Sequence, residues 1–242
     1  MTMNRHRSIL ASLASLLDYP DHDYEGRMNG ALSLAGQSAS EPDAPRDSGT
    51  LLDALTRFVG AMQSLAAGER EELYTATFDI TPACVLYVGV HLFGEDNSKR
   101  ARFMAALQAR YRESGFHAAG ELADHLAVIL RYAAATAEVE CRELAAYCLL
   151  GALEKMLGAL DRTNPYRSLM EAVYAALKAA CPGVQPIVVL HDQTQNRARN
   201  CLSFNTRCAC TGLTQPPPSA EDACSPPLPH TLVASPGQMV GP

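Results

Sequence analysis

Apolar residues recur every three to four positions along most of the first 181 residues of the chain. Such spacing places them on one face of a helix. The stripe is clearest over residues 51–65, 103–111, 122–133, 149–160 and 169–177. The pattern therefore predicts an all-α fold, a single helical bundle of about eight or nine helices that spans residues 1–181.

Prolines, glycines and polar runs mark the expected connections between these helices. The breaks are expected at Pro20, at residues 36–49, 94–97 and 115–120, and at Asn164-Pro165. An asparagine followed by proline is typical of a helix start, with Asn164 as the N-cap. A strand-like run at residues 187–190 is too short and isolated to form a sheet.

A polar interruption followed by a long apolar run stands out in the middle of the chain. Asp79 or Thr81 is expected to cap the next helix, with Pro82 in its first turn. Residues 84–93 are apolar almost throughout, apart from His91. This run predicts a central helix that is buried on most sides.

Two charged features on the expected helices have no evident partner in the sequence. Lys99, Arg100 and Arg102 open a helix and therefore oppose its dipole, which leaves a solvated face as the plain interpretation. Asp124 and His125 resemble part of a catalytic dyad, but adjacent residues on a helix do not face each other. We therefore expect Asp124 to cap or orient a connector and His125 to make a hydrogen bond.

Composition and charge narrow the classes of function. Aromatic residues make up only 6% of the 242 residues, which argues against nucleic-acid binding by base stacking. The net charge of −6 falls within residues 1–181 and favours a basic partner. No apolar run is long enough to cross a membrane. The basic start and the apolar stretch after it form a helical stripe instead of an export signal, so we expect a cytoplasmic protein.

Residues 182–242 differ from the rest of the chain. They hold 10 of the 15 prolines and show no amphipathic period, which predicts a disordered tail. Four of the eight cysteines lie before this tail and are expected to be buried free thiols. The tail cysteines lack the paired spacing of a structural zinc site, although Cys208 and Cys210 could bind a soft metal.

The sequence contains no phosphate-binding glycine loop, no His-Glu-x-x-His motif and no Gly-x-Ser-x-Gly motif. These absences leave no sign of nucleotide-dependent, zinc-protease or serine-hydrolase chemistry, and we expect no cofactor or metal ion of the protein's own. One alternative is a metal site inside the bundle, with Cys84, His91, Glu95 and His125 as ligands. The inward-facing Glu-x-x-His pairs that such bundles use are missing.

Several short motifs follow one another along the chain. They are Leu16-Leu17-Asp18-Tyr19-Pro20, Glu72-Leu73-Tyr74, Phe78-Asp79, Leu86-Tyr87, His91-x-x-Gly94-Glu95, Arg100, Tyr111-x-x-x-Gly115 and Glu121-Leu122-Ala123-Asp124-His125-Leu126. In this combination the chain resembles the nitrate reductase delta-subunit family of redox-enzyme maturation chaperones. The resemblance covers roughly residues 8–178 and is densest over 72–132. Ala123 is a departure, because the family usually has proline at this position.

The resemblance implies an all-helical cytoplasmic chaperone that is neither an enzyme nor a subunit of the finished reductase. Such a chaperone binds the N-terminal segment of an apo molybdoenzyme catalytic subunit, supports insertion of the molybdenum cofactor and delays docking at the membrane. The expected client is the nitrate reductase alpha subunit, and the alternative is a selenate, chlorate or dimethyl-sulfoxide-type enzyme. No nucleic acid partner and no stable membrane insertion are expected.

An apolar groove with acidic side chains suits a basic peptide. We expect the client peptide to contact Phe78, Asp79, Leu86, Tyr87, His91, Glu95, Tyr111, Asp124, His125 and Leu126. The acidic members of this set are the stronger candidates for binding, because their side chains attract a positively charged segment. The apolar members could equally be part of the core.

Overall fold

The computed structural model describes the backbone of residues 2–42, 44–94, 96–118 and 120–187, and side chains from residue 6 onward. Its helices are α1 (Thr2–Ser15), α2 (Tyr24–Ala39), α3 (Asp47–Gln63), α4 (Ala67–Phe78), α5 (Val88–Phe93), α6 (Asn97–Ser114), α7 (Leu126–Ala135), α8 (Glu138–Leu144), the π-helical turn η1 (Ala145–Leu149), α9 (Leu150–Ala159) and α10 (Pro165–Ala180). Because α8, η1 and α9 are continuous, the described residues form nine helical rods. The predicted all-α fold is therefore confirmed.

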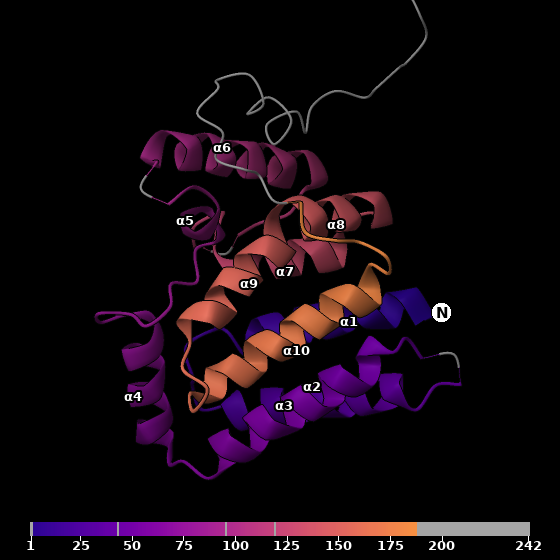
Figure 1. Cartoon of the computed structure of the whole chain (residues 1–242), viewed down its shortest axis with the longest axis vertical. Coiled ribbons are helices and arrows are strands. Elements are labelled where there is room, and N and C mark those ends of the chain that lie inside the picture. The colour runs from indigo at the N-terminus through magenta and orange to yellow at the C-terminus, as the bar shows by residue number, and fades with distance from the viewer. Residues whose placement is uncertain (1, 43, 95, 119, 188–242) are drawn as a thin grey trace, which may run out of the picture. The chain divides into compact units, whose positions relative to one another are not determined.

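The core lies where helices distant in sequence pack against one another. Helix α10 packs along α3 and α1, and α1 also contacts α2 and α7 (Figure 1). The predicted stripe of α3 faces this core, since Leu51, Leu55 and Phe58 are completely buried. Burial of each such side chain stabilises the fold by about 1.5–3 kcal/mol.

The start of α10 is held as the sequence predicts. The Oδ1 atom of Asn164 accepts a hydrogen bond from the backbone N–H of Tyr166 at 2.9 Å. Its amide nitrogen donates to the hydroxyl of Thr77 at 3.0 Å. The N-cap side chain therefore also joins α10 to the last turn of α4.

The prediction of one central helix over residues 84–93 is wrong. Only Val88–Phe93 is helical, and Tyr87 instead forms an antiparallel β-bridge with His125. The backbone N–H of Val88 donates to the carbonyl of Asp124, and that of Leu126 donates to the carbonyl of Leu86, both at 2.8 Å. When a segment is buried on all sides, its residues are apolar throughout, whether it is a helix or an extended strand. Hydrophobic periodicity therefore does not distinguish the two here.

The turn after α4 also differs from expectation. Asp79 does not cap the next helix, because its N–H donates to the carbonyl of Thr75 and so ends α4. Thr81 has a φ of 53° and lies in a turn, well before α5 begins. Leu122, the first residue of the predicted stripe over residues 122–133, is instead exposed in the connector before α7. Local backbone hydrogen bonds hold the chain in the turn after α4, where the N–H of Ile80 donates to the carbonyl of Thr75 and that of Cys84 to the carbonyl of Thr77.

The chain after α10 stays in contact with the helices as far as it is described. The Nζ atom of Lys178 donates a hydrogen bond to the carbonyl of Val184 at 2.8 Å. The backbone N–H of Ile187 donates to the carbonyl of Ala146 at 2.9 Å. Residues 188–190 of the expected strand-like run and the tail cysteines lie outside the described residues, as does the expected tail beyond residue 187. The domain boundary therefore stays a prediction. None of the described helices is long and apolar enough to span a bilayer.

Candidate functional site

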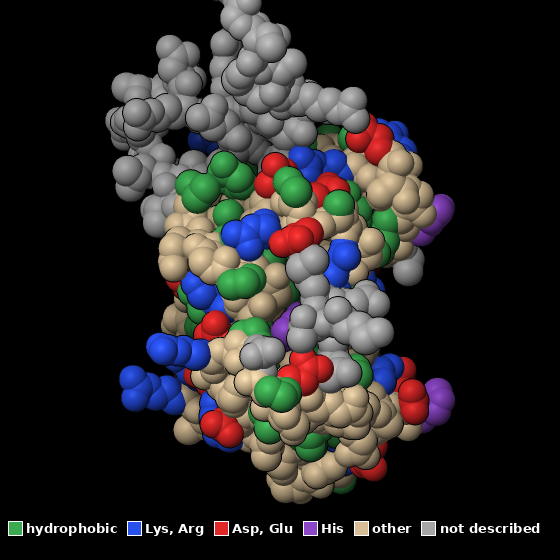
Figure 2. Space-filling view, turned by 90° about the vertical axis from the view of Figure 1, so that its right-hand side faces the viewer, with side chains coloured by type: hydrophobic (Ala, Val, Ile, Leu, Met, Phe, Trp, Pro, Cys, Tyr) green, Lys and Arg blue, Asp and Glu red, His purple; other side chains and the backbone are tan. Residues whose placement is uncertain are grey.

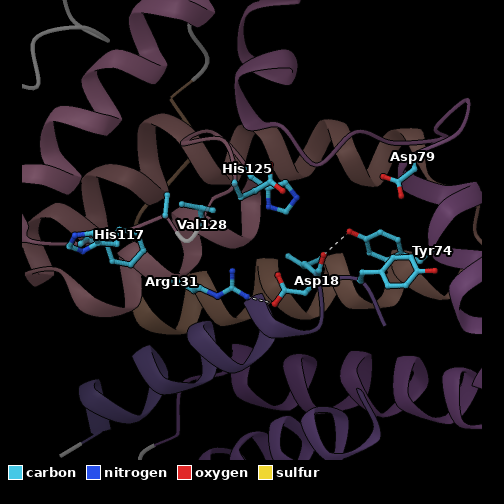
Figure 3. Close-up of a pocket in the computed structure, with 12 residues that line it drawn as sticks. Asp18, Tyr74, Asp79, His117, His125, Val128 and Arg131 are labelled. Carbon is cyan, nitrogen blue, oxygen red and sulfur yellow. Dashed lines mark hydrogen bonds and ion pairs between the residues drawn. The ribbon is translucent and has the colours of Figure 1, made fainter. Parts of the chain in front are cut away.

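A pocket of about 490 Å³ lies between the turn after α1, the end of α4, the loop before α7 and α7 itself (Figure 3). It is lined by Leu17, Asp18, Tyr19, Tyr74, Asp79, Phe116, His117, Ala118, Glu121, His125, Val128 and Arg131. Tyr74 and Asp79 lie at one end in Figure 3, His117 lies at the other, and His125 and Asp18 face each other between them.

Hydrogen bonds from three elements fix the turn after α1 that forms one wall. The hydroxyl of Tyr74 donates to the carbonyl of Leu17 at 3.2 Å, and that of Tyr24 donates to the carbonyl of Leu16 at 2.8 Å. Arg131 of α7 forms an ion pair with Asp18. The carboxylate of Asp18 is therefore positioned by a helix far away in the sequence.

A partly buried ion pair holds the connector before α7, which carries Glu121 and His125 of the pocket lining. Asp124 is 0% exposed, and its carboxylate accepts hydrogen bonds from Nε of Arg100 at 2.8 Å and from Nη2 at 3.2 Å. A Cβ atom on Gly89 would lie only 2.6 Å from this carboxylate, so α5 packs directly on the pair. Asp124 orients the connector before α7, as predicted, whereas the solvated face expected for Arg100 is wrong.

Asp96 interacts with a second cation of the first turn of α6, Lys99. The carboxylate of Asp96 accepts a hydrogen bond from the backbone N–H of Lys99 at 3.0 Å and pairs with the side chain of Lys99. These contacts, the backbone hydrogen bond first, lower the pKa of Asp96 from its ordinary value. A negative charge at the N-cap offsets the unfavourable position of the cations.

His125 brings to the pocket a buried polar atom that has no partner in the described part of the chain. Its side chain is only 8% exposed, and among the described residues its buried Nδ1 has no hydrogen-bond partner. The ring packs edge-on against Tyr87 at 5.6 Å, and Tyr87 in turn contacts Arg100. Burial lowers the pKa of His125, so its ring is neutral near pH 7. The hydrogen bond expected of this residue is therefore not made at Nδ1 within the described chain.

The lining carries a surplus of negative charge. The carboxylates of Asp18, Asp79 and Glu121 share the pocket with the guanidinium of Arg131. Arg131 pairs with Asp18, which leaves two exposed carboxylates beside the opening. A positively charged ligand is favoured here, and an anionic one is disfavoured.

The ten residues expected at the groove are distributed over several environments. Asp79 and His125 line the pocket. Tyr87 and Asp124 support it from behind, through the contacts of Tyr87 with the ring of His125 and of Asp124 with Arg100. Four others are buried in the core, namely Phe78, Leu86, Tyr111 and Leu126. His91 is half-buried, with Nε2 2.8 Å from the carbonyl of Val85, and Glu95 lies outside the described residues.

The pocket also contains residues that were not singled out as site residues. Asp18, Tyr74 and Glu121 fall within the motifs that carry the family resemblance, so the sequence held a signal for them. His117 and Arg131 fall outside those motifs. Their place in the pocket depends on how α7 and the loop before it pack, which no local pattern shows.

The ligand set considered for a metal site does not come together. Among the described residues, no group of three or more His, Cys, Asp or Glu side chains is placed to hold a metal ion. Cys84 and His91 instead both contact the carbonyl of Val85. Burial raises the pKa of Cys84 to about 12, which disfavours the thiolate that binds metals.

The family described as nitrate reductase delta subunit matches residues 41–163. The chain belongs to this family. The delta-subunit family consists of molybdoenzyme maturation chaperones and is not a catalytic family, and its members partner a nitrate reductase catalytic subunit. A search of curated proteins found no match to the chain.

The two histidines with lowered pKa values predict a pH-dependent stability for this delta-subunit family member. Burial lowers the pKa of both His91 and His125 below the unfolded value of about 6.5. The unfolded chain therefore binds more protons, and stability falls as the pH drops below about 6.5. We expect the urea midpoint to be lower at pH 5.5 than at pH 7.5.

The contribution of His125 to this pH dependence is measured with His125→Gln, which removes the titrating group. We expect this variant to show a smaller change in midpoint between the two pH values than the unchanged protein. The matched control is His117→Gln, which removes an exposed histidine of the same pocket. Equal pH dependence in all three proteins would contradict the assignment to His125.

Proposed function

We propose that this delta-subunit family member binds the N-terminal segment of an apo molybdoenzyme catalytic subunit in the pocket described above. The client proposed is the nitrate reductase alpha subunit. Binding keeps the client open for insertion of its molybdenum cofactor and delays docking on its membrane partner. The observation that carries the proposal is the buried, unpartnered Nδ1 of His125 in a pocket with surplus carboxylates.

Exposed apolar side chains at the pocket support a peptide ligand. Tyr19 lines the pocket, Ile80 follows Asp79 and Leu122 follows Glu121. All three are exposed, and Ile80 is 72% exposed. Apolar contacts beside carboxylates match a segment that alternates apolar anchors with Lys or Arg.

The volume of the pocket limits what enters it. About 490 Å³ is in the range of a small-molecule site and holds one or two side chains, not a whole helix. The rest of the client segment would therefore lie across the rim. Within the pocket, the neutral ring of His125 offers its free nitrogen to a polar group of the client.

The charge of the pocket is local. Figure 2 shows a face of the molecule on which acidic and basic side chains are interspersed with scattered apolar ones. A mixed surface of this kind gives little directional attraction. The two exposed carboxylates of the pocket are thus better placed to orient a basic segment than the net charge of the chain alone.

The proposed mechanism makes and breaks no covalent bonds. The chaperone must bind the unloaded client more tightly than the loaded one, because equal affinity for both states would shift neither. A difference of about 1–3 kcal/mol between the two states is sufficient for release on loading. We expect this exchange to take place in the cytoplasm, before the client reaches its membrane partner.

The decisive test of function is co-expression with the nitrate reductase alpha subunit. We expect the two proteins to co-purify when the client lacks its cofactor. We also expect the molybdenum content of the client to fall when the chaperone is left out. A client that acquires its full molybdenum content alone would contradict the proposal, and co-purification of a different molybdoenzyme would correct the client.

The acidic pocket is tested with Asp79→Asn combined with Glu121→Gln. Both side chains are exposed lining residues, so little folding stability depends on them. We expect the affinity for a synthetic peptide of the client N-terminus to fall by roughly tenfold, because two rim charges each contribute up to about 1 kcal/mol. Isothermal titration calorimetry at low salt measures this change.

A matched control separates local contacts from the effect of net charge. Asp53→Asn combined with Glu113→Gln removes the same two charges from exposed positions on α3 and α6, outside the pocket lining. We expect this variant to bind the peptide nearly as tightly as the unchanged protein. Equal losses in the two double variants would show that the peptide does not contact the pocket carboxylates.

A further inference from the structure

Two buried cysteines outside the pocket lie in direct contact. The Sγ atom of Cys141 on α8 is 3.6 Å from the Sγ atom of Cys181, which directly follows α10. The two side chains are 3% and 1% exposed and are 40 positions apart in the chain. The contact therefore joins the end of α10 to a helix that is distant in sequence.

We propose that Cys141 and Cys181 are a redox-sensitive pair that forms a reversible disulfide when the protein meets a hydroperoxide. The sulfur atoms already touch in the reduced protein. A bond of about 2.05 Å requires them to approach further, but it brings no distant elements together. The disulfide would thus form within the existing fold.

The surroundings make the two sulfurs chemically unequal. The pKa of Cys141 is lowered, first of all because the thiol of Cys181 donates a hydrogen bond to it. Burial opposes this shift, whereas the positive charges of Arg7 and Arg142 add to it and favour the thiolate. The same hydrogen bond and burial raise the pKa of Cys181. A stabilised thiolate beside a thiol is one feature of redox-active pairs. Because both side chains are buried, hydrogen peroxide would reach the sulfurs during local opening of the fold.

The reaction with hydrogen peroxide balances without another cofactor. The thiolate of Cys141 attacks one peroxide oxygen, the O–O bond breaks, and the leaving hydroxide takes a proton to become water. This step leaves a sulfenic acid on Cys141. The sulfur of Cys181 then attacks the Cys141 sulfur, the S–O bond breaks, and the leaving hydroxide takes the Cys181 proton to become the second water. Two electrons pass from the cysteine pair to the peroxide, and a dithiol reductant reverses the change.

The disulfide would link α8 covalently to the end of α10, where a side-chain hydrogen bond already connects the two segments. Arg142 donates a hydrogen bond to the carbonyl of Pro182, the residue after Cys181, at 3.2 Å. A covalent link at this place closes a long loop and so restricts the unfolded chain. We expect the oxidised protein to unfold at a higher temperature than the reduced protein, by about 5 °C or more.

Peptide mapping of the full chain tests the proposal directly. After treatment with a small excess of hydrogen peroxide, free thiols are blocked, and the protein is digested with trypsin without reductant. Cleavage at Lys and Arg places Cys141 in peptide 132–142 and Cys181 in peptide 179–197, each with no other cysteine. We expect these two peptides to be linked in the oxidised protein and separate after reduction.

Two variants distinguish the pair from the other buried thiols. Cys181→Ser removes the resolving thiol, so we expect Cys141 to stop at a sulfenic acid that dimedone traps. Cys84→Ser is the control, since burial raises the pKa of this thiol to about 12, and we expect it to keep the link. Circular dichroism checks that each variant is folded.

Peptide mapping of the unchanged protein tests the disulfide even if a variant fails to fold. Folded protein in which peptides 132–142 and 179–197 remain free thiols after peroxide treatment would overturn the proposal. A link from either peptide to one that contains a different cysteine would overturn it as well. The readout involves no client, so its outcome is independent of the proposed chaperone function.

Discussion

Replacing Arg100 by methionine is expected to lower the free energy of unfolding by about 3–5 kcal/mol. The substitution leaves the carboxylate of Asp124 completely buried and without its two hydrogen bonds from the guanidinium. A buried charge that loses its partner costs far more than the pair itself contributes. Urea unfolding at pH 7.5, followed by circular dichroism, measures the loss.

The neighbouring Arg102 provides the matched control for this prediction. It lies on the same helix and is exposed, so Arg102→Met should change stability by no more than about 0.5 kcal/mol. Adding Asp124→Asn to Arg100→Met removes the unpaired charge and should recover part of the loss. Similar midpoints for Arg100→Met and Arg102→Met would show that the ion pair does not stabilise the fold.

The ion pairs at the pocket show why sequence patterns predict the helices better than the site. Arg100 and Asp124 are 24 positions apart, and Arg131 and Asp18 are 113 positions apart. A helical stripe is local and repeats every turn, so the burial of Leu51 on α3 follows from its neighbours alone. Pairing over such distances depends on the packing of whole helices, which the stripe does not specify.

The motifs of the family resemblance indicate which segments lie at the pocket, but they do not indicate which side chains line it. These motifs supply Asp18, Tyr74 and Glu121 to the lining, although these residues come from three different elements. A motif marks a segment but does not show which of its side chains face the ligand. Phe78 and Asp79 are adjacent in one motif, yet Phe78 is buried in the core and Asp79 is exposed at the pocket.

These two neighbours should therefore show opposite phenotypes. Phe78 packs edge-on against Tyr74 at 5.2 Å and against Tyr166 at 4.8 Å, and so joins α4 to α10. Phe78→Ala leaves a cavity among these rings, and we expect the free energy of unfolding to fall by about 3–5 kcal/mol. Asp79→Asn removes only an exposed charge, and we expect the stability to change by less than about 0.5 kcal/mol.

Peptide binding should separate the two variants in the reverse order. Below its unfolding temperature, folded Phe78→Ala keeps the pocket carboxylates, so we expect it to bind the client peptide within about threefold of the unchanged protein. Asp79→Asn should bind it more weakly and show less dependence on salt, because one rim charge is gone. Phe78→Leu, which keeps most of the buried volume, should recover much of the lost stability. If Phe78→Leu instead kept its stability but no longer bound the peptide, Phe78 would contact the client. Phe78 would then belong to the binding site together with Asp79, and not only to the core.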